Sequence, residues 1–568
     1  MNCGCLFVLA GAPRAQAQAA VRRLDAWFEA LEWESEWRWL PETAALVGSC
    51  GPSGHGRSDL LGWGEPPPGA LASAAALLDA DDRSLRSLDR ATALLAVGAG
   101  GRVRLVTGAT GPQAVYRAGS PQDATAWATS AVAAALLTRP GREIALEPAH
   151  LPQVFAFGGV GGRATHLRGV AAVDSATVVD LRPGRPPSAR SYWPSIERWA
   201  RVPEPEAERA ADEALLASLD GRLSSAGRVH LGLTGGLDSG VVAVALAELG
   251  LDPVAMTWGT PGHPDVDGAA RLARRLGLAH EILGGGWHPA PPAPEDLESE
   301  ARWHEGLTAP PLLGRPGWPA GLRTFVTGAA GETGRAFYHR LLAGLYAEPR
   351  PEQIAAVWRP EDALGAGAAG RARAAVRDAK LTFLGDAAAA GQAGWRLLDV
   401  VYAEQRFRRW GRGILPRGPE RVVAAFSSPA LQRALVSLPL EARISDGWHR
   451  RFIARGAGDL VPPAPPLPRA GVPRPLRRLA ARLRARGSPP GGRHPYAEAF
   501  AARPELSRWV AEEALATPAL AGAMGEEWTA DVRGGFEAGL AQETEHALAA
   551  AGLATLEAAL RRAGARLD

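Results

Sequence analysis

The stretch T-G-G-L-D-S, residues 234–239, has the side chains and the backbone freedom that a phosphate-binding turn requires. It follows a short apolar run with Leu231 and Leu233 and precedes the apolar stretch 241–249, so a strand, a turn and a helix are expected in that order. Glycines let backbone N–H groups approach an anion closely, and a following helix directs its free N–H groups and its dipole to the same point. The stretch therefore predicts a phosphate cradle.

Individual positions of this turn have separate expected roles. Gly235 and Gly236 admit the anion, and Thr234 and Ser239 add hydroxyl donors. Asp238 suits an anion site only if a cation bridges it to phosphate, which indicates Mg²⁺. No Gly-Lys-Ser/Thr follows, so the turn is not a Walker A loop. The plainer interpretation is an ordinary glycine-rich strand-to-helix turn, but the ordered pattern favours nucleotide binding.

A second glycine-rich turn follows a later predicted strand, within residues 323–340. Sheets of parallel strands bind ligands at the carboxyl ends of those strands. We therefore expect Glu332 to face Asp238 across bound ATP and to share its Mg²⁺. The alternative is a plain turn with an exposed glutamate.

The elements that must position these turns divide the chain into two predicted units of an α/β protein. The first, residues 1–190, is β-rich (α+β) by its periodicity, and a Pro- and Arg-rich linker follows at 182–195. The second, residues 205–568, alternates strand and helix, which indicates a parallel sheet, and becomes helical after Pro351.

More local expectations follow from the same patterns. In the first unit we predict two strands around a turn in each of two segments, 102–119 and 169–184, and a helix at 124–138. In the second unit we predict a strand at 253–259 and a helix at 265–278, with Asp265 or Asp267 as its N-cap.

Composition places limits on the function. The 568 residues are 46% hydrophobic and 22% charged with a net charge of +3, which is typical of a globular protein and gives no support for nucleic-acid binding. Cys3, Cys5 and Cys50 cannot build a disulfide framework and suit a reducing cytoplasm. The apolar start lacks a preceding cation, so we interpret it as a first strand rather than a signal peptide. No stretch has the length of a membrane span.

The T-G-G-x-D-S turn resembles the S-G-G-x-D-S pyrophosphate loop of ATP pyrophosphatases, with Thr234 where serine is usual. With the second turn and the preceding β-rich unit, nearly the whole chain resembles the asparagine synthetase family. That resemblance implies a glutaminase-like domain at 1–190 and an ATP-binding synthetase domain of the adenine nucleotide α-hydrolase type at 205–568. It implies ATP and Mg²⁺ as cofactors, with AMP and pyrophosphate as products.

The resemblance also implies roles for single residues. Asp238 and Glu332 correspond to the Mg²⁺ ligands. The remaining positions would contact the nucleotide: the pyrophosphate loop is Thr234, Gly235, Gly236 and Ser239, the adenosine contacts are Met256 and Gly328, and Arg335 would touch pyrophosphate.

Departures from the family narrow the expected activity. Glutamine-dependent asparagine synthetases carry a cysteine directly after the initiator methionine, where this chain has Asn2, so we expect a degenerate glutaminase domain. Ala329 stands where asparagine synthetases have Glu and β-lactam synthetases have Tyr. The form G-x-x-G-E-x-x-R-x-x-Y, residues 328–338, is similar to that of lasso peptide cyclases, which are ATP-dependent macrolactam synthetases.

That resemblance implies closure of a ring between a peptide's N-terminal amine and an Asp or Glu side chain. The partners would then be a processed precursor peptide, a leader peptidase and a precursor-recognition protein. With Ala329 unable to act as a base, Tyr402, Glu404 and Arg406 are candidates for acid–base work. The alternative is a helix in which Tyr402 faces the core and Glu404 pairs with an Arg.

Family members also place a lysine late in the chain. Lys380 is the only lysine here and lies elsewhere, so Arg469 is the expected substitute. Three other functions stay open. They are an asparagine synthetase or small-molecule amide or β-lactam synthetase-like amidotransferase, a tRNA-modifying or thiolating ATP pyrophosphatase, and a catalytically inactive scaffold or binding protein.

Overall fold

The fold is taken from a computed structural model. It describes residues 5–51, 59–65, 68–88, 90, 92–120, 124–138, 144–259, 261–283, 294–305, 318, 322–339, 348–364, 367–410, 419–461, 504–515, 518–537, 550 and 553–561. The described residues form a mixed α/β protein in which two antiparallel sheets precede a parallel one.

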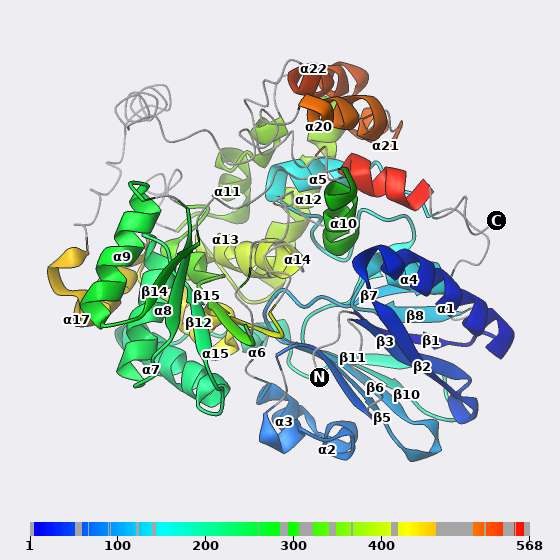
Figure 1. The fold of residues 1–568 in the computed structure, drawn as a ribbon, viewed down its shortest axis with the longest axis horizontal. Coiled ribbons are helices and arrows are strands. Elements are labelled where there is room, and N and C mark those ends of the chain that lie inside the picture. The colour runs from blue at the N-terminus through cyan, green and yellow to red at the C-terminus, as the bar shows by residue number, and fades with distance from the viewer. Residues whose placement is uncertain are drawn as a thin grey trace.

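The two antiparallel sheets pack face to face, with helices on both outer faces (Figure 1). The six-stranded sheet has the order β2-β3-β1-β8-β7-β9 and comprises β1 (Cys5–Ala10), β2 (Glu34–Leu40), β3 (Ala45–Gly51), β7 (Tyr116–Gly119), β8 (Thr125–Ala128) and β9 (Val170–Ala172). The five-stranded sheet has the order β11-β10-β6-β5-β4 and comprises β4 (Leu60–Gly64), β5 (Thr92–Val97), β6 (Val103–Thr107), β10 (Thr177–Leu181) and β11 (Ser188–Ser191).

Alternate residues of the strands fill the space between these sheets, as the period of two requires. Helices α1 (Arg14–Phe28) and α4 (Ala131–Thr138) cover the outer face of the six-stranded sheet. Helix α2 (Ala74–Asp79) covers the other sheet, followed by α3 (Asp82–Arg86). The prediction of a first strand at the apolar start is confirmed by β1.

Both predicted strand pairs of this unit were wrong in their pairing. The segments 102–119 and 169–184 each contain two strands, but the two strands join different sheets. In 102–119, β6 joins the five-stranded sheet and β7 the six-stranded one. In 169–184, β9 joins the six-stranded sheet and β10 the five-stranded one. The chain crosses between sheets there, because each strand buries its apolar side chains against the opposite layer. A strand pattern predicts the strands but not their partners.

Two further local predictions need correction. Residues 124–138 are not one helix: β8 comes first and pairs with β1 and β7 on either side, and only then does α4 begin. The predicted linker 182–195 contains β11, which pairs with β10 at the edge of its sheet. In both segments strand pairing within the folded unit overrides the local composition.

The parallel sheet has the order β14-β13-β12-β15-β16. Its strands are β12 (Val229–Gly232), β13 (Val254–Trp258), β14 (His280–Leu283), β15 (Thr324–Thr327) and β16 (Arg421–Ala424). The predicted strands at 253–259 and after 323 are confirmed, whereas β16 interrupts a region predicted as helical. The helices around this sheet include α7 (Glu204–Leu223), α8 (Leu237–Glu248), α9 (Pro264–Leu276), α15 (Pro429–Ser437) and α17 (Gly447–Ala457).

Helix α9 begins differently from the prediction. Its N-cap is His263, whose ring nitrogen accepts from the backbone N–H of Asp265. Asp267 instead accepts from the backbone N–H of Gly262, one residue before the cap. Both aspartates lie in the first turn, where their charge favours the helix dipole.

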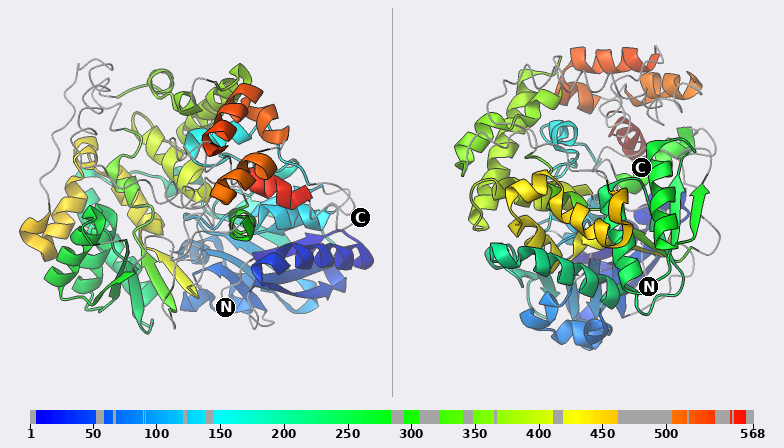
Figure 2. Two further views of the ribbon diagram at one scale, coloured as in Figure 1. Left: turned by 45° about the horizontal axis from the view of Figure 1, so that its top comes forward. Right: turned by 90° about the vertical axis from the view of Figure 1, so that its left-hand side faces the viewer.

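The remaining helices lie outside the three sheets. They are α5 (Leu151–Phe157), α6 (Ser195–Arg198), α10 (Pro294–His304), α11 (Pro351–Val357), α12 (Gly370–Ala389), α13 (Arg396–Val401), α14 (Arg408–Trp410), α16 (Leu440–Ile444), α20 (Pro504–Trp509), α21 (Pro518–Met524) and α22 (Glu526–Glu537). One large apolar core contains residues of α1, α4, α5, α12, α13 and the C-terminal helices. Figure 2 shows the C-terminal helices, in orange and red, above the antiparallel part. No described helix has the length and apolar character needed to cross a membrane.

Candidate nucleotide and metal site

The two glycine-rich turns lie next to each other at the carboxyl edge of the parallel sheet. Strand β12 is flanked by β13 on one side and by β15 on the other, and all three run parallel. The chain proceeds from β12 outward to β13 and β14, and then returns to β15 on the opposite side. The strand ends at such a reversal of strand order are where sheets of this kind bind ligands.

The first turn is held in shape by its own hydroxyl groups. Ser239 Oγ accepts from the backbone N–H of Thr234 at 3.1 Å and lies 3.1 Å from Thr234 Oγ1. Thr234 Oγ1 also accepts from the backbone N–H of Gly236, the N-cap of α8. Residues 234–236 are exposed while Ser239 is buried. The turn therefore exposes its backbone to solvent, while the buried Ser239 hydroxyl holds it in place.

Glycine is required by the close packing around these turns. A Cβ at Gly235 would lie 2.9 Å from the carbonyl oxygen of Pro264, at the start of α9. A Cβ at Gly328 would lie 2.9 Å from the backbone of Asp238 and of Ser239. The two turns and α9 therefore meet backbone to backbone, at distances that admit no side chain.

Asp238 lies between two cationic or potentially cationic groups. Arg335 Nη1 donates to its Oδ2 at 3.2 Å, and His449 Nε2 lies 3.1 Å from its Oδ1. Burial alone would raise the pKa of Asp238, but His449 and Arg335 outweigh that effect and the net pKa is lowered. Asp238 is therefore ionised at neutral pH.

Glu332 lies in the second turn and meets Tyr402, whose hydroxyl donates to Glu332 Oε2 at 2.9 Å. Burial and the nearby charge of Asp238 raise the pKa of Glu332. Two carboxylates that repel each other in a partly buried site are the donor set that a divalent cation neutralises.

The residues present fit a magnesium ion. Asp238 Oδ1 is buried without an aligned hydrogen bond among the described residues, although His449 lies close to it. The described residues contain no group of three or more His, Cys, Asp or Glu side chains able to hold a metal. Mg²⁺ commonly takes one or two carboxylates and completes its shell with phosphate oxygens and water, so two carboxylates are sufficient.

The second turn is conformationally strained. Ala330 has φ of 72° and Ala336 has φ of 50°, and these two alanines flank the short helical turn Gly331–Arg335. Non-glycine residues rarely adopt this left-handed conformation, at a cost on the order of 1–2 kcal/mol each. Backbone strain of this kind concentrates at ligand sites, which suits the candidate site.

The other predicted nucleotide contacts lie around the same site. Met256 is on β13, its side chain is buried in an apolar cluster, and its carbonyl oxygen accepts from Leu233 N–H. Arg335 is engaged by Asp238 and, through Nε at 3.0 Å, by Asp446. The structure therefore brings Arg335 to Asp238, and its predicted contact with pyrophosphate stays a prediction.

Sequence reasoning missed His449 and Asp446. Asp446 is the N-cap of α17 and His449 lies in its first turn. Both come more than 200 residues after Asp238 in the chain. Asp446 has φ of 58° and accepts from Arg335. No local pattern connects these residues to the turn, and only the packing of α17 against α8 brings them together.

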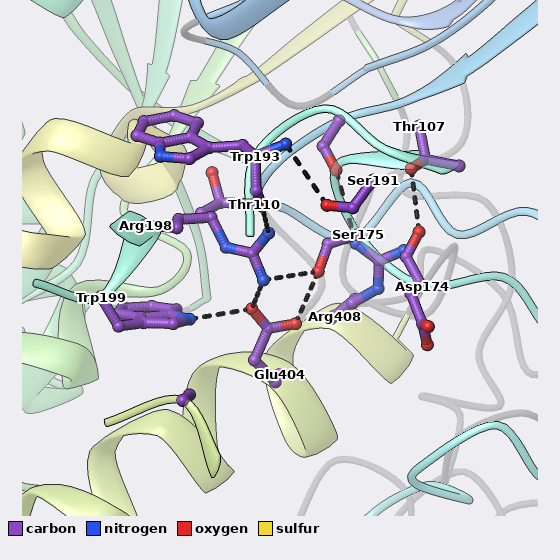
Figure 3. Close-up of polar contacts among 12 residues, drawn as sticks. Thr107, Thr110, Asp174, Ser175, Ser191, Trp193, Arg198, Trp199, Glu404 and Arg408 are labelled. Carbon is purple, nitrogen blue, oxygen red and sulfur yellow. Dashed lines mark hydrogen bonds and ion pairs between the residues drawn. The ribbon is translucent and has the colours of Figure 1, made fainter. Parts of the chain in front are cut away.

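Glu404 takes the structural alternative considered from the sequence. Its carboxylate accepts from Arg198 Nη2 at 2.8 Å, Ser175 Oγ at 2.9 Å and Trp199 Nε1 at 3.1 Å (Figure 3). Arg198 and Trp199 belong to α6 and the residue after it, and Ser175 lies in the antiparallel part. Tyr402 rather than Glu404 touches the candidate site, and Arg469 lies outside the described residues.

One cavity among the described residues lies away from these turns. It has a volume of about 420 Å³ and is lined at the edge of the antiparallel sheets by Trp127, Arg117, Arg182 and Arg185, among others. None of the predicted site residues lines it. The candidate site is instead the carboxyl edge of the parallel sheet, where the two turns meet.

A known protein family matches one segment of the chain. Residues 210–284 match the family model of asparagine synthase, a segment that runs from α7 to β14 and includes the turn 234–239. No curated protein matches the chain. The match supports a relation of this segment to asparagine synthetase-like proteins.

A solved structure of glutamine phosphoribosylpyrophosphate amidotransferase from B. subtilis, complexed with ADP and GMP, is 10% identical to the chain. The similarity covers 49% of this chain and 65% of that one, with a TM-score of 0.20. This chain thus spans less than two thirds of that protein, and a TM-score this low carries no weight for the fold.

Proposed function

We propose that this protein is an ATP-dependent carbon–nitrogen ligase that activates a carboxylate as an acyl-adenylate and couples it to an amine. The single observation that carries this proposal is the meeting of Asp238 and Glu332 beside the turn 234–239, at the point where the strand order reverses. The match of residues 210–284 to the asparagine synthase family supports it.

The chemistry explains why these parts are needed. A carboxylate does not react with an amine at neutral pH, because oxide is a poor leaving group, whereas AMP is a good one. The backbone N–H groups at the start of α8, residues 237–239, would bind the displaced pyrophosphate. Mg²⁺ held by Asp238 and Glu332 would neutralise charge on the phosphates. Tyr402 would hold Glu332 in place through its hydroxyl.

The finer proposal is macrolactam closure of a lasso-type peptide, in the cytoplasm, after a leader peptidase has processed the precursor. Its support is the form G-x-x-G-E-x-x-R-x-x-Y at 328–338 and the presence of Ala329 in place of an acid–base side chain. A folded peptide already holds its amine near the activated side chain, which reduces the entropy cost of coupling. An asparagine synthetase or small-molecule amide synthetase is the second candidate, favoured by the family match.

Product analysis tests the general reaction. Incubation with ATP, Mg²⁺ and the acceptor should release AMP and pyrophosphate, and Asp238→Asn should abolish the release. The matched control is Asp252→Asn, an exposed aspartate just after α8, which should leave the release unchanged. Release of ADP and phosphate by the wild-type protein would exclude the acyl-adenylate.

Mass spectrometry tests the finer proposal. With its cognate precursor peptide and a leader peptidase, ATP and Mg²⁺ should yield a peptide lighter by one water. Asn2 predicts that glutamine will not serve as the amine source. Formation of asparagine from aspartate and ammonia at a comparable rate would overturn the cyclase assignment in favour of the second candidate.

A further inference from the structure

The π-helical turn Tyr402–Phe407 connects two distant parts of the molecule. Tyr402, at its start, donates to Glu332 in the candidate site. Glu404, two residues later, accepts from Ser175 of the antiparallel part and from Arg198 and Trp199 (Figure 3). The same turn therefore touches the candidate site with one side chain and the N-terminal part with another.

The residues after Glu404 strengthen the contact with the N-terminal part. Gln405 accepts from the backbone N–H of Gly162, and Arg406 donates to the carbonyl oxygen of Phe157. Arg408 donates to the carbonyl oxygen of Val173 at 3.0 Å, and Arg409 donates to that of Gly162. Five side chains between 404 and 409 thus hold the N-terminal part, four of them through its backbone.

Glu404 is the most specific of these anchors. Its side chain is 16% exposed and that of Arg198 is 5% exposed, so both charges are largely removed from water. A buried carboxylate with several donors has little freedom, because loss of one partner leaves an uncompensated charge. The turn that carries both Glu404 and Tyr402 is π-helical, a conformation that occurs frequently at functional sites.

We propose that Glu404 is a positioning residue: Ser175 of the N-terminal part and Arg198 of α6 hold Glu404 and thereby keep Tyr402 in contact with Glu332. The N-terminal part would then support the nucleotide site mechanically, whether or not it retains any activity of its own. The effect on nucleotide binding rests on the proposed function, whereas the mechanical link does not.

Hydrogen exchange tests the mechanical link without any ligand. Ser175→Ala removes one donor to Glu404 from the N-terminal side and is the milder variant, and Glu404→Gln removes the charge. We expect faster exchange in both variants at residues 402–410 and also at 331–339, which neither substituted residue contacts directly.

The matched control is Glu65→Gln. Glu65 also accepts from a buried arginine of the other part of the chain, Arg222, and both side chains are at most 1% exposed. This pair does not involve the turn Tyr402–Phe407. If Glu65→Gln changes exchange at 331–339 as much as Ser175→Ala does, or if Ser175→Ala changes 402–410 alone, the proposal is wrong.

Nucleotide affinity tests the consequence at the site. The dissociation constant of ATP with Mg²⁺, measured by calorimetry, should rise roughly tenfold in Glu404→Gln and in Tyr402→Phe, the order of coupling seen between contacting groups. The dissociation constant of the double variant should be no higher than that of the more strongly impaired single variant, because both substitutions act through the Tyr402 hydroxyl. Independent, multiplying effects would overturn the proposal.

The two measurements separate this inference from the proposed function. If wild-type protein does not bind ATP with Mg²⁺, the proposed function fails, and the exchange data decide the mechanical link alone. If ATP binds and the exchange at 331–339 is unaffected by Ser175→Ala, the function stands and the positioning role is excluded.

Discussion

Gly331 lies so close to Asp238 that no side chain fits at position 331. A Cβ there would lie 2.5 Å from Cγ of Asp238 and 2.6 Å from its Oδ1. The glycine of the second turn therefore sets how near the second carboxylate, Glu332, comes to the first. Separation of the two turns by even one methyl group would move the two carboxylates apart.

Gly331→Ala should therefore abolish binding of ATP with Mg²⁺ while the protein stays folded, because the inserted methyl displaces Asp238. The control is Gly221→Ala in α7, where a Cβ meets nothing within 4 Å. Alanine is the better helix former, so this control should be neutral or slightly stabilising, by up to about 1 kcal/mol. Calorimetry of binding and urea unfolding check both variants. Unimpaired binding in Gly331→Ala would contradict the close approach of the two turns.

Glu332→Gln should separate stability from function. Burial and the charge of Asp238 raise the pKa of Glu332, so its ionised form is disfavoured in the folded protein. Neutral glutamine relieves that repulsion and still accepts from Tyr402, so the ligand-free protein should be as stable as wild type or more so. Stimulation of AMP and pyrophosphate release by Mg²⁺ should be lost, because an amide is a weaker ligand than a carboxylate for a hard cation. A destabilised variant that still responds to Mg²⁺ would contradict this assignment.

The candidate site was predictable from the sequence only where its residues are close together in the chain. The turn at 234–239 and the turn containing Glu332 each have a local pattern of glycines, hydroxyls and a carboxylate. His449 and Asp446 have none, because they reach Asp238 and Arg335 only through the packing of α17. The role of Glu404 likewise depended on Ser175 and Arg198, which lie over 200 residues away.

The fold, too, was predictable from the sequence only in its local features. Alternation of strand and helix predicted the parallel sheet, because its three central strands, β12, β13 and β15, are largely buried. The antiparallel strands were recognisable one by one, but β9 and β10 pair with different sheets although only a few residues separate them. Partner choice there is decided by which layer each strand packs against, which no local pattern encodes.

Glutaminase activity should be absent. Glutamine-dependent asparagine synthetases carry their nucleophilic cysteine at the position that Asn2 holds in this chain. The nearby Cys5 is buried in β1 opposite Cys50, where it packs as an apolar residue. Incubation with glutamine should release no glutamate, with or without ATP. Glutamate release that disappears in Cys3→Ala would contradict the degenerate glutaminase domain.

His166 should make the protein sensitive to acid. The side chain is fully buried, and burial lowers its pKa from 6.5 to about 3, with His150 nearby adding to the effect and the backbone of Glu305 opposing it. The folded protein therefore keeps this ring neutral at pH values where the unfolded chain protonates it. Stability from this site is complete above pH 6.5 and is lost as the pH falls from 6.5 towards 3, because the unfolded state then binds the extra proton.

Replacement by a ring that does not titrate isolates the effect. His166→Phe should flatten the pH dependence of stability between pH 4 and pH 6, by up to about 1.4 kcal/mol per pH unit for one proton. Urea-unfolding midpoints measured at several pH values give this slope, and any packing cost of phenylalanine appears as a constant offset at every pH. A variant whose midpoint falls with acid as steeply as that of wild type would show that His166 is not held neutral in the folded protein.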